Sequence, residues 1–386
     1  MIARKFSIRF AILLLGLWLL VGCAQGTGPV VSGSPMPTQR VEEPTEQPAP
    51  APEESLRLPT PPAEETPSPA PTAEETPAPT AEETPSPTPS HTPSPTLAIP
   101  QTGMTDPVPA AYTRPCDRPG SVQRLVYDSR DYAGSGAAIV KTAYVYLPYG
   151  YDEADASTRY DILYLMHGWT GHAGEFFQYG AFKNILDHLI ANGDTPPMIV
   201  VSPSFYTENS RTDFDASMDA LRLFYLDFEA HLMPAVEGRY FTYAASTSDD
   251  DLKASRDHRA FGGFSMGAVT TWLMLCHDSD YIRYYLPMSG ACFYYGDYDD
   301  YQTERNVDHL ESVVRDGDLN DRGYFVYHAV GTLDAYREQS VLQAEEMLSR
   351  GAFPPEHYVF YQRKDGRHDR YSVDEFLYNA LPLFFR

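Results

Sequence analysis

Residues 106–386 predict an α/β fold with a mostly parallel central sheet, an N-terminal antiparallel hairpin and helices on both faces. Two observations lead to this prediction. Short, nearly continuous apolar runs, typical of strands buried on both faces, alternate with segments of helical spacing. Almost all aromatic residues also lie in this part of the chain. It is long enough for one large hydrophobic core or at most two small domains, and we treat it as one domain.

The elements are assigned in chain order. Residues 122–127 and 138–147 are rich in β-branched and aromatic residues, with Gly134 and Gly136 between them, which is typical of an antiparallel hairpin. Apolar runs predict further strands at 161–166, 197–201, 258–264, 282–288, 324–330 and 358–361. Helical spacing predicts helices at 181–191, 216–236, 336–348 and 373–385, with 216–236 as one long amphipathic helix.

The N-terminal segment predicts export. Basic residues precede a short apolar run, as in a signal peptide, here over residues 1–22. The run ends in Leu-Val-Gly before Cys23, which resembles a bacterial lipobox. We expect cleavage before Cys23 and a lipid on its sulfur, with residues 23–26 as the lipidated N-terminus. The protein would then lie outside the cytoplasm, anchored to the bacterial cell membrane at the cell surface. The alternative is an ordinary signal peptide or an uncleaved anchor.

Residues 27–105 predict a disordered linker. This stretch holds 21 of the 34 prolines and no Phe, Tyr or Trp, and AEETP recurs in it at residues 63, 73 and 81. Such a composition buries too little apolar surface to offset the entropy of folding. Proline-rich chains extend by about 3.1 Å per residue, so the linker would hold the folded domain away from the membrane.

The net charge and the cysteines limit the partners. A formal charge of −24 disfavours nucleic acid and anionic lipid, so we expect contact with the membrane only through the lipid. No obligate protein partner is indicated. Cys116, Cys276 and Cys292 allow at most one disulfide, and we expect Cys276 and Cys292 at opposite edges of the sheet, which disfavours a bridge between them. No Cys/His spacing resembles a zinc site, and neither a metal nor a cofactor is predicted.

Polar residues follow three of the predicted strands in the order Ser265, Asp334, His368. In a mostly parallel sheet, sites form at the carboxyl ends of the strands. The order Ser…Asp…His is that of the α/β-hydrolase triad, so the sequence predicts this fold and a serine nucleophile.

Ser265 lies in Gly263-Phe264-Ser265-Met266-Gly267, which fits the pattern G-x-S-x-G between a strand and a helix. The turn is so tight that Cβ atoms at residues 263 and 267 would collide, so both positions require glycine. The N–H of Met266, at the helix N-terminus, is a candidate oxyanion donor. The alternative interpretation is that Ser265 is an ordinary helix N-cap.

His368 is the candidate general base, because the other histidines are poorly placed. His258 begins the strand before Ser265, His328 lies inside a strand and His357 precedes one. His167 belongs to the loop that should supply the second oxyanion donor.

Asp334 is the candidate partner of His368, whereas Asp365 and Asp369 share the histidine's own loop and are more simply turn residues. The loop after the strand 161–166 places the N–H of Trp169 as the second oxyanion donor. The indole of Trp169 either lines the pocket or packs in the core.

Six segments resemble the esterase D / feruloyl esterase group, the first family of carbohydrate esterases. In order they are YDILYLMHGWTG, PPMIVVSPSFY, SRDHRAFGGFSMG, YLPMSG, GTLD and GRHD, and the similarity spans about residues 116–385. The resemblance implies hydrolysis of feruloyl or acetyl esters on plant polysaccharides such as xylan. It also implies that Ser265, Asp334 and His368 form the triad, with Trp169 and Met266 as oxyanion donors.

Two departures from the family bear on the substrate. The histidine loop, 364–369, is poorer in Gly and Thr than is usual in the family and has no aromatic residue directly after the histidine. The loop 291–298 is unusually rich in tyrosine. Stacked aromatic rings suit a feruloyl ring or a sugar face. The candidate substrate contacts are Phe205, Tyr206, Phe293, Tyr294 and Tyr295.

The predicted function is a serine carboxylesterase that acts on acylated polysaccharide or oligosaccharide through an acyl-enzyme. The first alternative is an acyltransferase of the mycolyltransferase type, in which a sugar replaces water. A general esterase on small acyl esters and a binding protein with an inactive site are the others.

Overall fold

The computed structural model describes residues 101–207, 211–298 and 300–386. The predicted signal peptide, the predicted lipidation site Cys23 and the predicted linker up to residue 100 lie outside these residues. Within the described ranges, no helix has the length and apolar character needed to cross a membrane.

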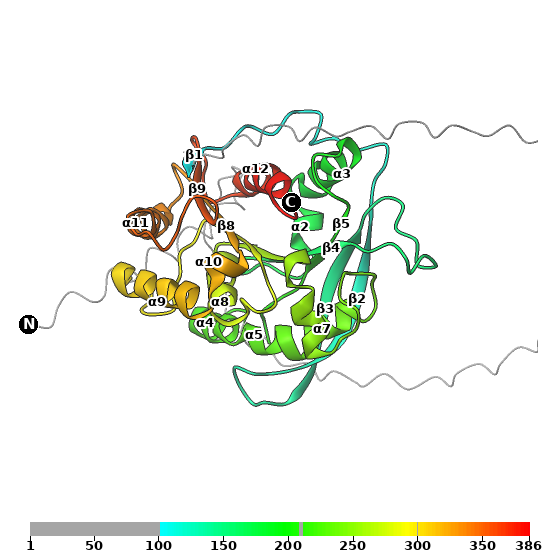
Figure 1. Cartoon of the computed structure of the whole chain (residues 1–386), viewed down its shortest axis with the longest axis horizontal. Helices are drawn as coiled ribbons and strands as arrows, with labels where there is room; N and C mark the ends of the chain where they lie inside the picture. Colours follow the sequence, from blue (N-terminus) through cyan, green and yellow to red (C-terminus); the bar gives the residue numbers. More distant parts are fainter. Residues whose placement is uncertain (1–100, 208–210, 299) are drawn as a thin grey trace, which may run out of the picture. The chain divides into compact units, whose positions relative to one another are not determined.

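Nine strands of the described part form one sheet in the order β1-β9-β8-β7-β6-β4-β5-β3-β2 (Figure 1). Neighbouring strands are parallel except at β2/β3 and β3/β5, which confirms the predicted hairpin. The strands are β1 Thr102–Met104, β2 Ser121–Arg130, β3 Ala138–Leu147, β4 Asp161–Met166, β5 Met198–Ser202, β6 Arg259–Phe264, β7 Tyr284–Met288, β8 Phe325–Gly331 and β9 Tyr358–Arg363.

Helices cover both faces of this sheet, and each face has its own buried core (Figure 1). On one face lie α2 Glu175–Gln178, α3 Phe182–Asn192 and α12 Arg370–Ala380. The other face carries α4 Phe214–Arg222, α5 Phe224–Asp227, α6 Met233–Glu237, α8 Met266–His277, α9 Thr303–Asp316 and α11 Arg337–Leu348. The short helices α7 Asp249–Ala254 and α10 Leu319–Arg322 lie in connecting segments. The predicted α/β-hydrolase architecture is confirmed.

The predicted helix over 216–236 is interrupted. Leu223, with φ −104° and ψ 5°, leaves the helical torsion range between α4 and α5. A π-helical turn, Phe228–Leu232, then joins α5 to α6. Pro234, in the first turn of α6, has no N–H for the carbonyl of Ala230 and crowds that carbonyl, so the widened turn has a local cause. Apolar spacing alone does not reveal such a turn.

The boundary predicted for the linker is also wrong. Residues 102–104 form β1, which pairs in parallel with β9, Thr102 opposite Phe360 and Met104 opposite Gln362. The hydroxyl of Thr105 donates a 2.5 Å hydrogen bond to Glu375. This short strand is held by backbone pairing and has no apolar pattern. Its composition therefore resembles that of the linker, which is why the prediction placed it there.

Cys276 and Cys292 are neighbours, contrary to the expectation that they lie at opposite edges. After β7 the chain doubles back along α8, where the indole N–H of Trp272 donates to the Gly290 carbonyl at 3.1 Å. Tyr294 then reaches His277, the last residue of α8. A hydrogen bond to Cys292, together with burial, raises the pKa of the Cys276 thiol, and both cysteines are free.

Candidate active site

Ser265, Asp334 and His368 lie beyond the carboxyl ends of β6, β8 and β9, at one edge of the sheet. The loop after β4 brings His167, Gly168 and Trp169 to the same edge. Since β4 and β6 are adjacent parallel strands, these two loops meet beside Ser265.

Ser265 has a backbone conformation that L-residues rarely adopt, with φ 59° and ψ −117°. A Cβ at position 263 would lie 2.3 Å from the Gly267 carbonyl oxygen, and one at position 267 would lie 2.2 Å from the Met166 carbonyl oxygen. The backbone strain at Ser265 costs about 1–3 kcal/mol of folding free energy, and it persists only where the surrounding structure enforces it. The predicted need for both glycines is confirmed.

The alternative that Ser265 is an ordinary N-cap is wrong. Its side chain makes no capping hydrogen bond to α8. Its backbone N–H instead donates to the Met288 carbonyl at 2.9 Å, which ties the turn to β7. Met266 is the first residue of α8, where an N–H group has no carbonyl of its own helix to bond. This N–H group is therefore available beside the Ser265 side chain.

The predicted pairing of Asp334 with His368 is confirmed. Nδ1 of His368 lies 3.0 and 3.1 Å from the two carboxylate oxygens of Asp334. The Asp334 side chain is fully buried, and it also accepts the N–H of Tyr336 at 2.8 Å. The imidazole packs against the rings of Phe264 and Tyr336, with centroids 4.4 and 4.7 Å away. Because Phe264 directly precedes Ser265, His368 lies next to the nucleophile elbow.

The histidines excluded by sequence have other partners. Nδ1 of His258 is 2.7 Å from Asp161, at the edge where the parallel strands begin. His328 is buried in β8, and its Nδ1 lies 3.0 Å from the Tyr358 hydroxyl. His357 lies against two backbone carbonyls.

The rival aspartates on the histidine loop have structural positions. Asp369 is the N-cap of α12 and accepts the N–H of Ser372 at 2.9 Å. Asp365 has a left-handed backbone with φ 56°, and its N–H donates to the Thr332 hydroxyl at 2.8 Å. Both are turn residues, as predicted.

A set of hydrogen bonds fixes the loop after β4. Burial lowers the pKa of His167 to about 3, so its imidazole is neutral. Its Nδ1–H then donates to the Gly168 carbonyl at 2.7 Å, and its Nε2 accepts from the Ser204 hydroxyl at 2.8 Å. The N–H of Thr170 donates to the Tyr206 hydroxyl at 2.7 Å. His167 thus lies in the loop predicted to supply the second oxyanion donor, and its role there is to hold that loop in place.

Gly168 holds this loop directly against the elbow. A Cβ at position 168 would lie 3.1 Å from the Cβ of Ser265 and 3.2 Å from the Phe264 carbonyl oxygen. Since Trp169 is the next residue after Gly168, its backbone lies close to Ser265. The Trp169 indole packs at a right angle on Phe214, and its buried N–H has no hydrogen-bond partner among the described residues.

Aromatic residues connect Trp169 to His368, and we call Trp169, Phe214, Tyr298 and Tyr336 the aromatic wall. Successive centroids lie 5.3 Å apart for Trp169–Phe214, 5.8 Å for Phe214–Tyr298 and 5.7 Å for Tyr298–Tyr336. Tyr336 then contacts His368. Sequence reasoning missed Phe214 and Tyr336, which no strand-end motif identifies.

Three predicted substrate contacts are wrong. Phe293 is only 1% exposed and packs against Tyr298 and Tyr301. Tyr294 stacks on His309 with centroids 3.7 Å apart, and Tyr295 packs against Tyr294. Both tyrosines lie near the last turn of α8. This helix has 12 residues and begins directly after Ser265, so a rise of about 1.5 Å per residue places its last turn roughly 18 Å from Ser265.

The other two predicted contacts support the loop after β4. Phe205 is buried, with its ring 4.8 Å from that of His167. Tyr206 also packs on His167, at 5.0 Å, and its hydroxyl holds the N–H of Thr170. Phe205 is too buried to touch a substrate, so its prediction as a substrate contact is wrong, whereas that of Tyr206 stays a prediction. Among the described residues there is no cluster of three His, Cys, Asp or Glu side chains that could hold a metal ion.

A strained serine at a strand–helix elbow, beside an Asp–His pair on a mostly parallel sheet, defines the class of α/β-hydrolases. Residues 141–377 match the family model Esterase, described as "Putative esterase", and the chain belongs to this esterase family.

Among the curated proteins that share sequence with this chain, two are described by their names as xylanases. Endo-1,4-beta-xylanase Y of Acetivibrio thermocellus is 33% identical over 286 residues, which cover 72% of this chain and 24% of that protein. An endo-1,4-beta-xylanase/feruloyl esterase of Xylanibacter ruminicola is 28% identical over 180 residues, 45% of this chain and 22% of that protein. The matched regions thus span about a quarter of these relatives.

Solved structures resemble the described fold. A serine-to-alanine variant of the feruloyl esterase module from Clostridium thermocellum, complexed with sinapinate, has a TM-score of 0.65 and 32% identity, covering 75% of this chain and 96% of that one. A ferulic acid esterase of carbohydrate esterase family 1 from Anaeromyces mucronatus has a TM-score of 0.55 at 18% identity, covering 73% and 97%. The second likeness concerns the fold alone.

Proposed function

We propose that this protein hydrolyses acyl esters on plant cell-wall polysaccharide, feruloyl esters on xylan above all, through an acyl-enzyme on Ser265. The observation behind the proposal is the joint placement of the strained Ser265 and the hydrogen-bonded Asp334–His368 pair at one edge of the sheet. The substrate class is supported by the 32% identity to a feruloyl esterase module.

In this mechanism His368 accepts the proton of the Ser265 hydroxyl while the oxygen attacks the ester carbonyl carbon. The carbonyl oxygen becomes negative and accepts hydrogen bonds from the N–H groups of Met266 and Trp169. Each of these hydrogen bonds stabilises the transition state by about 2.7–4 kcal/mol. His368 then gives its proton to the sugar oxygen as the bond between this oxygen and the acyl carbon breaks, so the sugar leaves with a free hydroxyl and an acyl-enzyme remains. A water molecule, deprotonated by His368, then attacks the acyl carbon. His368 returns this proton to the Ser265 oxygen as the bond to the acyl group breaks, which releases the acid and restores Ser265.

Asp334 is proposed to position His368 and to stabilise its imidazolium form. Its carboxylate bonds Nδ1, which leaves Nε2 as the nitrogen that exchanges the proton with Ser265. The Tyr336 N–H bonds the same carboxylate, so Asp334 cannot turn away from the imidazole without losing a second hydrogen bond.

The aromatic wall suits the acyl group of a feruloyl ester. Aromatic pairs contribute about 0.5–1.5 kcal/mol beyond the area that they bury, and a feruloyl ring offers a flat face to such pairs. The unpartnered indole N–H of Trp169 could donate to an oxygen substituent of that ring. An acetyl group has no ring to offer to such pairs.

Export and lipid anchoring through Cys23 complete the proposal, and they rest on the N-terminal sequence alone. Detergent-phase partitioning of the full chain, compared with a Cys23→Ser variant, tests the anchor. The proposal expects the variant to remain in the aqueous phase, and equal partitioning would contradict it.

The deciding experiment assays methyl ferulate, acetylated xylan and p-nitrophenyl acetate with wild type and Ser265→Ala. We expect activity on methyl ferulate and a loss of at least about 10⁴-fold in the variant. Absence of wild-type activity on all three substrates would reject an esterase. Turnover that requires an added acceptor sugar would instead favour the acyltransferase.

A further inference from the structure

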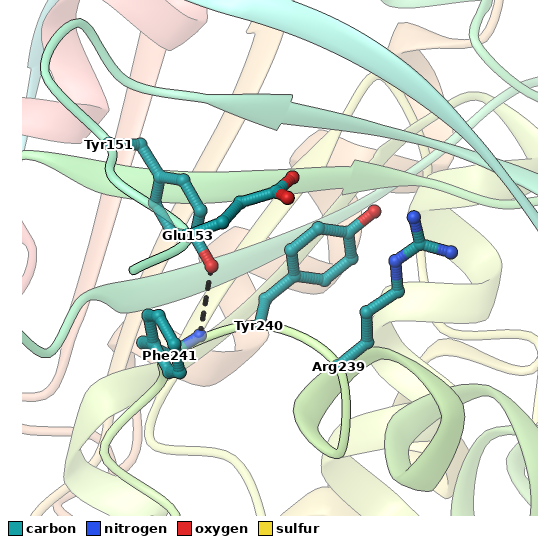
Figure 2. Close-up of a pocket in the computed structure, with 5 residues that line it drawn as sticks. All are labelled: Tyr151, Glu153, Arg239, Tyr240 and Phe241. Atoms are coloured by element: carbon teal, nitrogen blue, oxygen red, sulfur yellow. Dashed lines mark hydrogen bonds between the residues drawn. The ribbon is translucent and has the colours of Figure 1, made fainter. Parts of the chain in front are cut away.

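A hollow far from Ser265 is lined by Tyr151, Glu153, Arg239, Tyr240 and Phe241 (Figure 2). It has a volume of about 190 Å³. An adjoining hollow of about 310 Å³ shares Tyr151 and Glu153 with it. Together they reach the size range of small-molecule sites. The adjoining hollow is lined by Pro119, Ser121, Gln123, Leu147, Pro148, Tyr149, Gly150, Tyr151 and Glu153, and we treat the two together as one hollow.

This hollow belongs to the edge where the parallel strands begin. Residues 148–151 follow β3, and β3 runs antiparallel to β5, with Tyr144 opposite Ser202 and Tyr146 opposite Val200, so the end of β3 lies at the edge where β5 begins. The carbonyl of Phe241 accepts the N–H of Tyr160, directly before β4. The six residues of β4, at about 3.3 Å each, therefore place roughly 20 Å between this hollow and the edge that holds Ser265. It cannot form part of the acyl site.

The floor of the hollow is rigid. The Tyr151 hydroxyl accepts the N–H of Phe241 at 3.2 Å, drawn as the dashed line in Figure 2, and their rings stack with an interplanar angle of 20°. Tyr240 is only 3% exposed, and its hydroxyl bonds Gln123 at 3.5 Å. The Arg239 guanidinium lies over the Tyr240 ring, 5.5 Å from its centroid. A ligand would meet a surface that is already ordered.

The rim combines an exposed aromatic ring with hydrogen-bonding groups. Tyr149 is 59% exposed, although it lines the hollow. Glu153 and Arg239 supply one negative and one positive charge, and the Gln123 amide bonds Glu153 at 3.4 Å. Aromatic faces that stack on sugar rings, beside carboxylate, amide and guanidinium groups that bond hydroxyls, are the chemistry that recognises a glycan. The balanced charges favour a neutral one.

We propose that this hollow is a second binding site for the neutral main chain of a polysaccharide, which it holds while the opposite edge cleaves esters. The identity of the chain as xylan rests on the proposed function, whereas glycan binding itself does not. A net charge of −24 disfavours nucleic acid and other anionic polymers. An open, shallow rim suits a chain that continues beyond the hollow.

Binding is tested by affinity electrophoresis in gels that contain soluble arabinoxylan or mixed-linkage β-glucan, with the Ser265→Ala variant so that no ester is cleaved. We expect Tyr149→Ala and Arg239→Ala each to raise the dissociation constant at least about threefold, and Tyr149→Phe to keep affinity because the ring remains. Leu342→Ala removes an exposed apolar side chain of α11 and is the control. Unchanged retardation of Tyr149→Ala, or equal loss in Leu342→Ala, would overturn the proposal.

A second measurement separates this proposal from the proposed function. With Ser265 intact, Tyr149→Ala should leave kcat/KM on methyl ferulate unchanged and lower the rate on insoluble feruloylated arabinoxylan about three- to tenfold. Equal loss on both substrates would contradict a separate glycan site. Glycan binding without any esterase activity would reject the esterase and leave the second site standing.

Discussion

The two edges of the sheet use polar residues in opposite ways. At the carboxyl edge, Ser265 has a strained backbone, the Met266 N–H has no helical partner and the Trp169 indole N–H is buried without one among the described residues. At the amino edge, Arg259 and Glu237 form a buried pair, and all five guanidinium N–H groups are used. Polar groups that satisfy one another hold the fold, and those left unsatisfied can meet a substrate.

The pair at the amino edge connects several elements. The Arg259 guanidinium binds both oxygens of Glu237 at 2.7 and 2.8 Å, and it bonds the carbonyls of Leu252 and Tyr281 as well. The Tyr164 hydroxyl donates to the same carboxylate. The pair therefore joins β6 and β4 to the end of α6, and its function is structural.

The largest expected effect is on catalysis at the carboxyl edge. Asp334→Asn should lower kcat on methyl ferulate by about 10⁴-fold, because an amide no longer holds His368 in the required tautomer. The melting temperature should change by no more than a few degrees. Steady-state kinetics and a melting curve on one preparation check both, and a loss below tenfold would remove Asp334 from the mechanism.

The reverse pattern is expected at the amino edge. Glu237→Gln leaves Arg259 buried without its counter-charge, so the free energy of unfolding should fall by about 3–5 kcal/mol. Activity per folded molecule should not change. Urea unfolding measures the loss, and Lys253→Gln, which breaks an exposed pair with Asp249, is the control with an expected loss below about 1 kcal/mol.

A smaller expected effect is a loss of folding stability at acidic pH. Burial lowers the pKa of both His167 and His328 to about 3, below the ordinary value of 6.5. Each histidine is thus neutral when folded and binds a proton only on unfolding, so its stabilisation is complete above pH 6.5 and decreases as the pH falls toward 3. At pH 4.5 each of the two histidines should lower the free energy of unfolding by roughly 2–3 kcal/mol relative to its value at pH 7. Urea unfolding at pH 7 and 4.5 checks this, and a flat profile in this range would contradict it.

The smallest effect tests the aromatic wall. Tyr298→Ala should lower kcat/KM on methyl ferulate about tenfold, which is about 1.4 kcal/mol, and leave p-nitrophenyl acetate nearly unchanged. Tyr294→Ala, in the same loop but stacked on His309, is the matched control. Parallel losses on both esters, or a larger loss in Tyr294→Ala, would exclude Tyr298 from the acyl site.

Local patterns predicted much of the sheet and the elbow. The strand 161–166 matches β4 residue for residue, and glycines 263 and 267 have the spacing that their close contacts require. These features follow from short segments in which burial and backbone geometry act on neighbouring residues. The Asp334–His368 bond was predicted from strand ends, because parallel strands bring their carboxyl ends together.

Features that depend on distant contacts were missed. The tyrosine-rich loop offers several rings, and only the return of the chain along α8 determines that Tyr298 reaches Phe214 whereas Tyr294 reaches His309. The same return brings Cys292 to Cys276. The hollow beside Tyr151 joins residues from the end of β3 to residues after α6, and no motif connects them.

The most direct test of the central claim is to quench the reaction with methyl ferulate within milliseconds and to analyse the digested protein by mass spectrometry. The account predicts one feruloyl group on the peptide that contains Ser265, formed at the rate of the burst phase and absent from Ser265→Ala. A feruloyl group on another residue, or undiminished turnover by Ser265→Ala, would contradict it.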